Sequence, residues 1–174
     1  SPLAGAQVSL EGYASGGRVH TLGVVDSIMY PGTISFRRFQ YPSRLPAEVQ
    51  RRMSRVAEDF LKGIGYDDAL FNVEFIYDAA RDALHVIEFN PKIASQFSDL
   101  FLKVDGQHSY RALLQLAVGE EPVFSRGHGD FRIAASCVLR TFEDKHVAGV
   151  PSVASIAEVA ADYPDAQIEI HALI

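Results

Sequence analysis

The sequence of 174 residues lacks several features that would point to a function directly. It contains no tryptophan and a single cysteine, Cys137, so an internal disulfide is excluded. Because Cys137 lies in the apolar run ASCVL, we expect it to be buried and inert, as free cysteines commonly are. A reducing, cytoplasmic location fits this cysteine usage. No apolar run is long enough to cross a bilayer, and no signal-like segment opens the chain.

Basic residues and the common nucleotide and hydrolase motifs are also scarce. The net charge is −6, and the sequence has only four lysines, with its arginines spread along the chain. We therefore expect no nucleic-acid partner, since such a partner requires a concentrated basic surface. The sequence has no G-x-x-x-x-G-K-[ST] loop, G-x-G-x-x-G turn, H-E-x-x-H helix or G-x-S-x-G elbow. Its six histidines are dispersed, without the spacing of a zinc site.

The residues that are present follow the pattern of a globular α+β protein. We expect strands at 6–14, 18–26 and 34–40, in a hairpin at 71–92, and at 131–142 and 167–174, and helices at 46–63, 95–104, 109–119 and within 151–164. This order favours a mainly antiparallel sheet with packed helices over strict strand–helix alternation. A change of composition near 120–130 predicts a division into a main part, 1–120, and an α/β appendage packed on it, 121–174.

The clearest helix is expected at 46–63. Pro46 suits the first helical position, and Glu48 suits the positive start of a helix. Apolar side chains recur at helical spacing and form one stripe, made of Val49, Met53, Val56, Ala57, Phe60, Leu61 and Ile64. We expect this stripe to face the core.

The most informative stretch is FNVEFIYDAARDALHVIEFNPK, at 71–92, which reads as two strands and a turn. We take the turn to be centred on Arg81. The facing pairs are then Glu74 with Glu88, Asn72 with Asn90, and Ile76 with Val86. A slip of one residue would place the two glutamates on opposite faces of the sheet. Pro91 ends the ladder of hydrogen bonds, which leaves Lys92 near the acidic pair, where its charge suits an anion.

Facing glutamates would hold two carboxylates roughly 5 Å apart, where like charges repel. Either one carboxyl group keeps a proton, as in a general acid pair, or a cation lies between them. Two carboxylates and the Asn90 carbonyl are oxygen ligands suited to Mg²⁺ or Mn²⁺. Since Mg²⁺ completes its shell with waters and phosphates, such a site expects a polyphosphate. The competing interpretation is a pair of solvated surface glutamates without a function.

The segments N-V-E-F-I-Y-D and V-I-E-F-N-P-K resemble the metal-binding hairpin of ATP-grasp enzymes such as biotin carboxylase, carbamoyl-phosphate synthetase and amino-acid ligases. In that family one strand carries Glu and the next carries Glu-x-Asn-x-Arg. Glu74, Glu88 and Asn90 match the two acids and the amide, and Lys92 stands where arginine is usual. Arginine binds an anion with a planar fork, whereas lysine supplies only the charge. Glu11 resembles an acid that is frequent in the preceding hairpin, and the resemblance extends over roughly 6–120.

The resemblance implies an α+β fold like the C-terminal subdomain of an ATP-grasp domain. It implies ATP and Mg²⁺ (or Mn²⁺) as cofactors, with Glu74, Glu88 and Asn90 as metal ligands and Lys92 as a catalytic cation. The implied reaction is ligation of a carboxylate or bicarbonate to an amine or another nucleophile through an acyl phosphate. The substrates would be small molecules, and a missing N-terminal half would supply the remaining ATP contacts.

Three further expectations complete the sequence analysis. The chain starts at Ser1-Pro2 and ends within the strand-like QIEIHALI, so we expect a fragment of a longer protein that is inactive by itself. One alternative is a non-catalytic α+β interaction module. The other is a carboxylate–metal phosphohydrolase, which would need further acids, and the nearby candidates are Asp78, Asp82 and Asp99.

Overall fold

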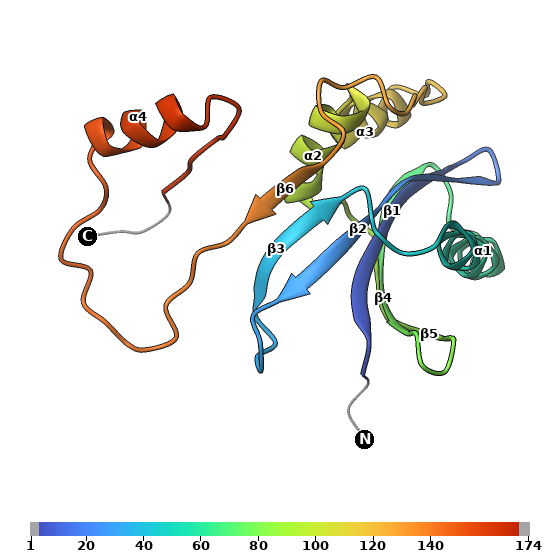
Figure 1. The fold of residues 1–174 in the computed structure, drawn as a ribbon. Coiled ribbons are helices and arrows are strands. Elements are labelled where there is room, and N and C mark those ends of the chain that lie inside the picture. Colours follow the sequence, from blue (N-terminus) through green and yellow to red (C-terminus); the bar gives the residue numbers. More distant parts are fainter. Residues whose placement is uncertain (1–3, 171–174) are drawn as a thin grey trace. The chain divides into compact units, whose positions relative to one another are not determined.

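The computed structural model describes residues 4–170 and groups the chain into two compact units, Ser1–Leu139 and Arg140–Ile174. The first unit contains all the strands of the sheet and three helices (Figure 1). Its elements in chain order are β1 (Ala6–Ser15), β2 (Arg18–Met29), β3 (Phe36–Tyr41), α1 (Ala47–Gly63), β4 (Ala69–Asp78), β5 (Ala83–Asn90), α2 (Ser95–Asp105), α3 (Ser109–Ala117) and β6 (Ala134–Cys137). The division after residue 120 stays a prediction.

The strands form one antiparallel six-stranded sheet in the order β5-β4-β1-β2-β3-β6. Figure 1 shows α1 on one side of this sheet and α2 and α3 on the other. The α+β class with a mainly antiparallel sheet and packed helices is therefore confirmed. The central strand β1 pairs with β4 along one edge and β2 along the other, and its residues from Val8 to Ser15 are buried.

Helix α1 packs on the first face of the sheet through one row of its predicted stripe. The buried members of that row are Val49, Met53, Ala57 and Leu61, which are spaced by four residues and therefore lie one turn apart. Three other members, Val56, Phe60 and Ile64, were expected to face the core but are exposed by 36%, 43% and 59%. Phe60 instead stacks on Phe89 of β5, with ring centroids 4.0 Å apart.

Helices α2 and α3 cover the second face, where aromatic rings pack edge to face. Phe97 contacts Phe39 in this way, with ring centroids 5.2 Å apart, and Phe101 contacts Tyr41 at 4.9 Å. Gly23 of β2 lies beneath the second pair. A Cβ atom there would lie 2.6 Å from the Tyr41 ring and 2.7 Å from the Phe101 ring, so glycine permits this close approach.

The C-terminal segments differ from the sequence predictions. The long strand expected at 131–142 is only β6, four residues at the edge of the sheet. Cys137 is exposed, so its predicted burial is wrong: in this edge strand only Ala134 packs into the core. Residues 167–170 form no strand, and the rest of that predicted strand lies outside the described residues.

The second unit contains helix α4 (Val153–Asp162), which agrees with the helix expected within 151–164. The Ser152 hydroxyl accepts a hydrogen bond from the Ser155 amide at 3.1 Å and so caps the helix. None of the residues of α4 is buried. In the part of the chain that the structure describes, no helix combines the length and the apolar character needed to span a membrane.

Candidate functional site

The hairpin of β4 and β5 brings the two predicted acids together. Glu74 faces Glu88, and the next pair on the same face is Asn72 with Asn90, as the sequence predicts. Nearer the turn the prediction is wrong, because Ile76 faces His85 rather than Val86. A β-bulge beside Glu74 shifts the register there by one residue. The bulge adds Ile87 to β5 on the turn side of the acidic pair, and this added residue is what brings Glu88 opposite Glu74.

The electrostatics of the pair follow from its partial burial. Burial raises the pKa of Glu74 above its usual value, and the nearby charge of Glu88 raises it further. A hydrogen bond from Gln7 Nε2 to Glu74 Oε2, 3.0 Å long, acts in the opposite direction. Glu88 itself is exposed at the edge of the sheet. The site therefore offers one half-buried and one solvated carboxylate on the same face.

The polar strip continues from the hairpin across β1. Ser9 faces Glu74, and Glu11 faces Asn72. Ser9 is only 3% exposed, and its hydroxyl lies 3.5 Å from that of Ser27 on the next strand. Gln7 and Ser9 were not predicted as part of the site, although the alternation of polar residues along AQVSLEG was a signal for them.

Glu11 is the most deeply buried acid of this strip, with no exposed surface. Its Oε2 accepts a hydrogen bond from the Ala94 amide at 2.8 Å, whereas Oε1 has no hydrogen-bond partner. Burial raises the pKa of Glu11 to about 7, despite smaller lowering effects of the Ala94 amide and of the nearby Ser109 and Asn72 side chains. The Ser109 hydroxyl and the Asn72 amide nitrogen are themselves buried without a hydrogen-bond partner.

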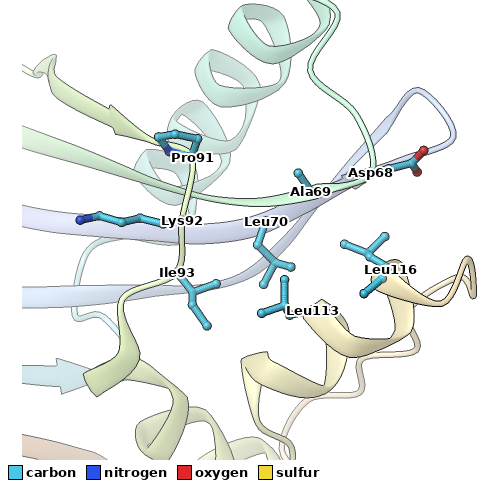
Figure 2. Close-up of a pocket in the computed structure, with 9 residues that line it drawn as sticks. Asp68, Ala69, Leu70, Pro91, Lys92, Ile93, Leu113 and Leu116 are labelled. Atoms are coloured by element: carbon cyan, nitrogen blue, oxygen red, sulfur yellow. The ribbon is translucent and has the colours of Figure 1, made fainter.

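Lys92 follows the end of β5 by two residues and is exposed. It lines the rim of a pocket of about 360 Å³, whose other walls are Asp68, Ala69, Leu70, Pro91, Ile93, Leu113, Leu116 and Ala117. Figure 2 shows Leu70, Ile93 and Leu113 converging in this pocket while the Lys92 side chain extends away from them. Leu113 is 40% exposed on this surface. Among the described residues, Lys92 forms no ion pair, so its ammonium group remains available to an anion.

The donor set was tested against the cation that the sequence predicts. No group of three or more His, Cys, Asp or Glu side chains is placed to hold a metal within residues 4–170. The available donors are the carboxylates of Glu74 and Glu88, with the Asn90 amide oxygen two residues further along β5 on the same face. Mg²⁺ takes one or two carboxylates and completes its octahedral shell with waters and phosphate oxygens, so these donors fit a Mg²⁺ or Mn²⁺ ion that is shared with a polyphosphate.

No protein-family model matches the sequence, and no curated protein is similar to it. Solved structures do share the fold. The biotin carboxylase domain of Hydrogenobacter thermophilus 2-oxoglutarate carboxylase is 22% identical with a TM-score of 0.62, and the match covers 76% of this chain and 29% of that one. Biotin carboxylase from Campylobacter jejuni is 17% identical with a TM-score of 0.64 over 79% of this chain and 30% of that one.

A third match comes from a different enzyme. Phosphoribosylglycinamide synthetase from Anaerococcus prevotii is 14% identical with a TM-score of 0.59 over 70% of this chain and 31% of that one. The chain thus spans less than a third of the length of each of these three proteins. Because the identities are below 25%, the likeness establishes the fold. The chain has the α+β fold of an ATP-grasp subdomain, shared with biotin carboxylases and phosphoribosylglycinamide synthetase.

Proposed function

We propose that this chain is the C-terminal part of an ATP-grasp ligase, and that Glu74, Glu88 and Asn90 hold Mg²⁺ or Mn²⁺ against the phosphates of ATP. The observation that carries the proposal is the facing of Glu74 and Glu88 on one face of the β4–β5 hairpin. Two structures that share the fold support the choice of ligand: the Hydrogenobacter domain contains MgADP and bicarbonate, and the Campylobacter enzyme is an ATP complex.

The metal ion would supply charge neutralisation and orientation of the phosphates when it is bound. Glu74 and Glu88 would then be ionised, because coordination favours the carboxylate form over the protonated form. The Asn90 amide oxygen would complete the protein's part of the shell. Lys92 would act as the catalytic cation, placing a point charge beside the anionic oxygens of the transferred group.

The proposed reaction joins a carboxylate, or bicarbonate, to an amine or another nucleophile. An oxygen of the carboxylate attacks the terminal phosphorus of ATP, the bond to ADP breaks, and an acyl phosphate forms. The nucleophile then attacks the acyl carbon, and inorganic phosphate leaves. The residues of this chain take no covalent part, so their contribution is positioning and charge.

The remaining contacts to ATP would come from an N-terminal half of the same protein. This inference is supported by the likeness to chains of which the match covers less than a third. We infer that the 174-residue chain has little or no ligase activity by itself. The protein acts in the cytoplasm on small molecules in this proposal.

The phosphohydrolase alternative receives no support from Asp78 and Asp82, the two acids at the turn of the hairpin. Asp78 binds the Arg81 guanidinium at 2.8 Å and accepts a hydrogen bond from the Ala80 amide. Asp82 binds Arg52 of α1 at 2.6 Å. Both carboxylates are therefore engaged in contacts of the turn and of α1.

The proposal is tested in the complete protein by calorimetric titration of Mn²⁺ in the presence of ATP. Glu88→Gln keeps the shape of the side chain but removes one ligand charge, so we expect it to weaken Mn²⁺ binding at least about tenfold and to abolish metal-dependent ATP turnover. Asp59→Asn, on the exposed side of α1, is the matched control and should leave both unchanged. Wild-type Mn²⁺ affinity in Glu88→Gln would refute the metal assignment and favour a non-catalytic module.

A further inference from the structure

Glu11, a buried acid, lies beneath the segment that joins β5 to α2, next to Asn90 and Lys92 of the proposed site. Glu11 belongs to the central strand β1, and its side chain is fully enclosed. Among residues 4–170, no basic side chain forms an ion pair with it. An isolated carboxyl group is costly to bury in the sheet, so a specific structural requirement is expected to retain it.

The requirement is visible at the start of α2. The Ala94 amide is the N-cap amide of that helix, and it donates to Glu11 Oε2 at 2.8 Å. Ala94 follows Lys92 by two residues and Asn90 by four. The backbone that joins β5 to α2 is therefore tied to the centre of the sheet by a buried hydrogen bond.

Glu11 also compensates for a lack of local caps. Neither α2 nor α3 has a side-chain cap of its own, and neither has an acidic residue in its first turn. The Glu11 carboxyl group lies beside the first residue of α3, Ser109, as well as bonding the N-cap of α2. One acid from β1 thus places its carboxyl group beside the starts of two helices, where backbone amides lack partners within the helix.

We propose that Glu11 is a positioning residue of the Glu74–Glu88 site, which acts through the Ala94 amide to hold the link Pro91–Ala94 in place. This inference rests on the proposed function, because the link matters through Asn90 and Lys92 at its start. Glu11 itself touches neither metal nor substrate in this assignment. Its burial and its raised pKa agree with a group whose partner is a backbone amide rather than a cation.

The test uses two variants that differ only in the acceptor. Glu11→Met keeps the volume but has no oxygen, whereas Glu11→Gln keeps an oxygen for the Ala94 amide. Measured by electron paramagnetic resonance in the complete protein with ATP, Glu11→Met should weaken Mn²⁺ binding about tenfold, and Glu11→Gln should stay within about twofold of wild type. Met53→Ala is the control, since it opens a cavity under α1 on the opposite face and should lower stability without changing Mn²⁺ affinity.

The possible outcomes separate the two proposals. If wild type binds Mn²⁺ and Glu88→Gln does not, but Glu11→Met binds as wild type does, only the role of Glu11 is refuted. Equal losses in Glu11→Met and Met53→Ala would likewise refute it, because the effect would follow stability alone. If wild type binds no Mn²⁺, both proposals fail.

A measurement on wild type keeps the inference testable if Glu11→Met does not fold. Hydrogen exchange should show the Ala94 amide protected nearly as strongly as the core strands, because its partner is fully enclosed. Exchange of the Ala94 amide as fast as that of the exposed Lys92 amide would overturn the proposal.

Discussion

A carboxyl group without a cation makes the stability of this protein depend on pH. The pKa of Glu11 is about 7 in the folded protein, against 4.5 as its ordinary value. Between pH 4.5 and pH 7, Glu11 is therefore protonated more often in the folded state than in the unfolded state. The contribution of Glu11 to the free energy of unfolding is greatest below pH 4.5 and falls as the pH rises through 7.

We predict that Glu11→Gln removes this pH dependence. The loss for wild type between pH 4.5 and pH 8 amounts to about 3 kcal/mol, since one pKa unit corresponds to about 1.4 kcal/mol. Urea unfolding of both proteins at the two pH values measures it. The stability of Glu11→Gln relative to wild type should rise by up to this amount at pH 8, while contributions from other titrating groups cancel. A relative stability that is the same at both pH values would contradict the burial of an ionisable Glu11.

The sequence predicted the partly exposed Glu74–Glu88 pair of the site but not the surroundings of the buried Glu11. Glu74 and Glu88 were paired correctly from a turn taken to be centred on Arg81, but the register near the turn differs by one residue and the bulge restores the facing of the glutamates. The environment of Glu11 could not be predicted, because it depends on the Ala94 amide, 83 residues away along the chain. Cys137 illustrates the same limit: its apolar neighbours suggested burial, but the strand lies at an edge.

At the scale of elements, the contact of α2 with the sheet depends on the glycine at position 23, which has no side chain to keep the helix away. Gly23 of β2 lies against Tyr41 and Phe101, and the phenolic hydroxyl of Tyr41 donates to Asp105 at the end of α2 at 2.6 Å. Both rings are buried, so neither can swing into solvent to make room. The space above Gly23 therefore fixes how closely α2 can approach β2 and β3.

We predict that Gly23→Ala destabilises the protein by about 1–3 kcal/mol, the usual cost of overpacking a filled core. The change in the urea midpoint measures this loss. Gly63→Ala is the matched control: it lies at the end of α1 with no atom within 4 Å of the new Cβ, and should be neutral or slightly stabilising. Equal stability of Gly23→Ala and wild type would show that α2 is not held by this contact.

Element boundaries were predictable where the hydrophobic period was long. Helix α1 begins and ends within one residue of the predicted range 46–63, because caps and an apolar stripe agree there. The bulge in the β4–β5 hairpin had no sequence signal, since an added residue in one strand changes no local propensity. The long strand predicted at 131–142 is wrong for a different reason: the composition favours a strand, but only four of these residues pair with β3.

At the scale of the whole chain, the two hydrophobic clusters formed by residues 4–170 both lie in the first unit. Every buried residue of these clusters lies between Val8 and Ala134. Residues beyond 120 contribute directly to this core. Phe124 packs against the cluster under α2 and α3, and the Tyr13 hydroxyl donates a hydrogen bond to the Pro122 carbonyl at 3.0 Å. The sheet also gains its last strand, β6, from this part of the chain.

We predict that a chain ending at Leu139 unfolds as cooperatively as the 174-residue chain, whereas one ending at Glu120 is markedly less stable. The shorter chain loses β6 and the contacts of Phe124 and Pro122, and so exposes apolar surface of β3 and α2. Thermal unfolding followed by circular dichroism compares the three lengths. Equal stability of the two truncated chains would instead support the predicted division after residue 120.

The position of β5 at the margin of the sheet has a further consequence for the acidic pair. The outer side of β5 offers unpaired backbone amides and carbonyls, next to the exposed apolar side chains of Val86 and Ile87. Such a strand invites pairing with another chain, and a charged side chain in the middle of it discourages that association. Glu88 is the one acid of this strand, so neutralising it, by mutation or by a bound cation, would also remove the repulsion that keeps neighbouring molecules from extending the sheet.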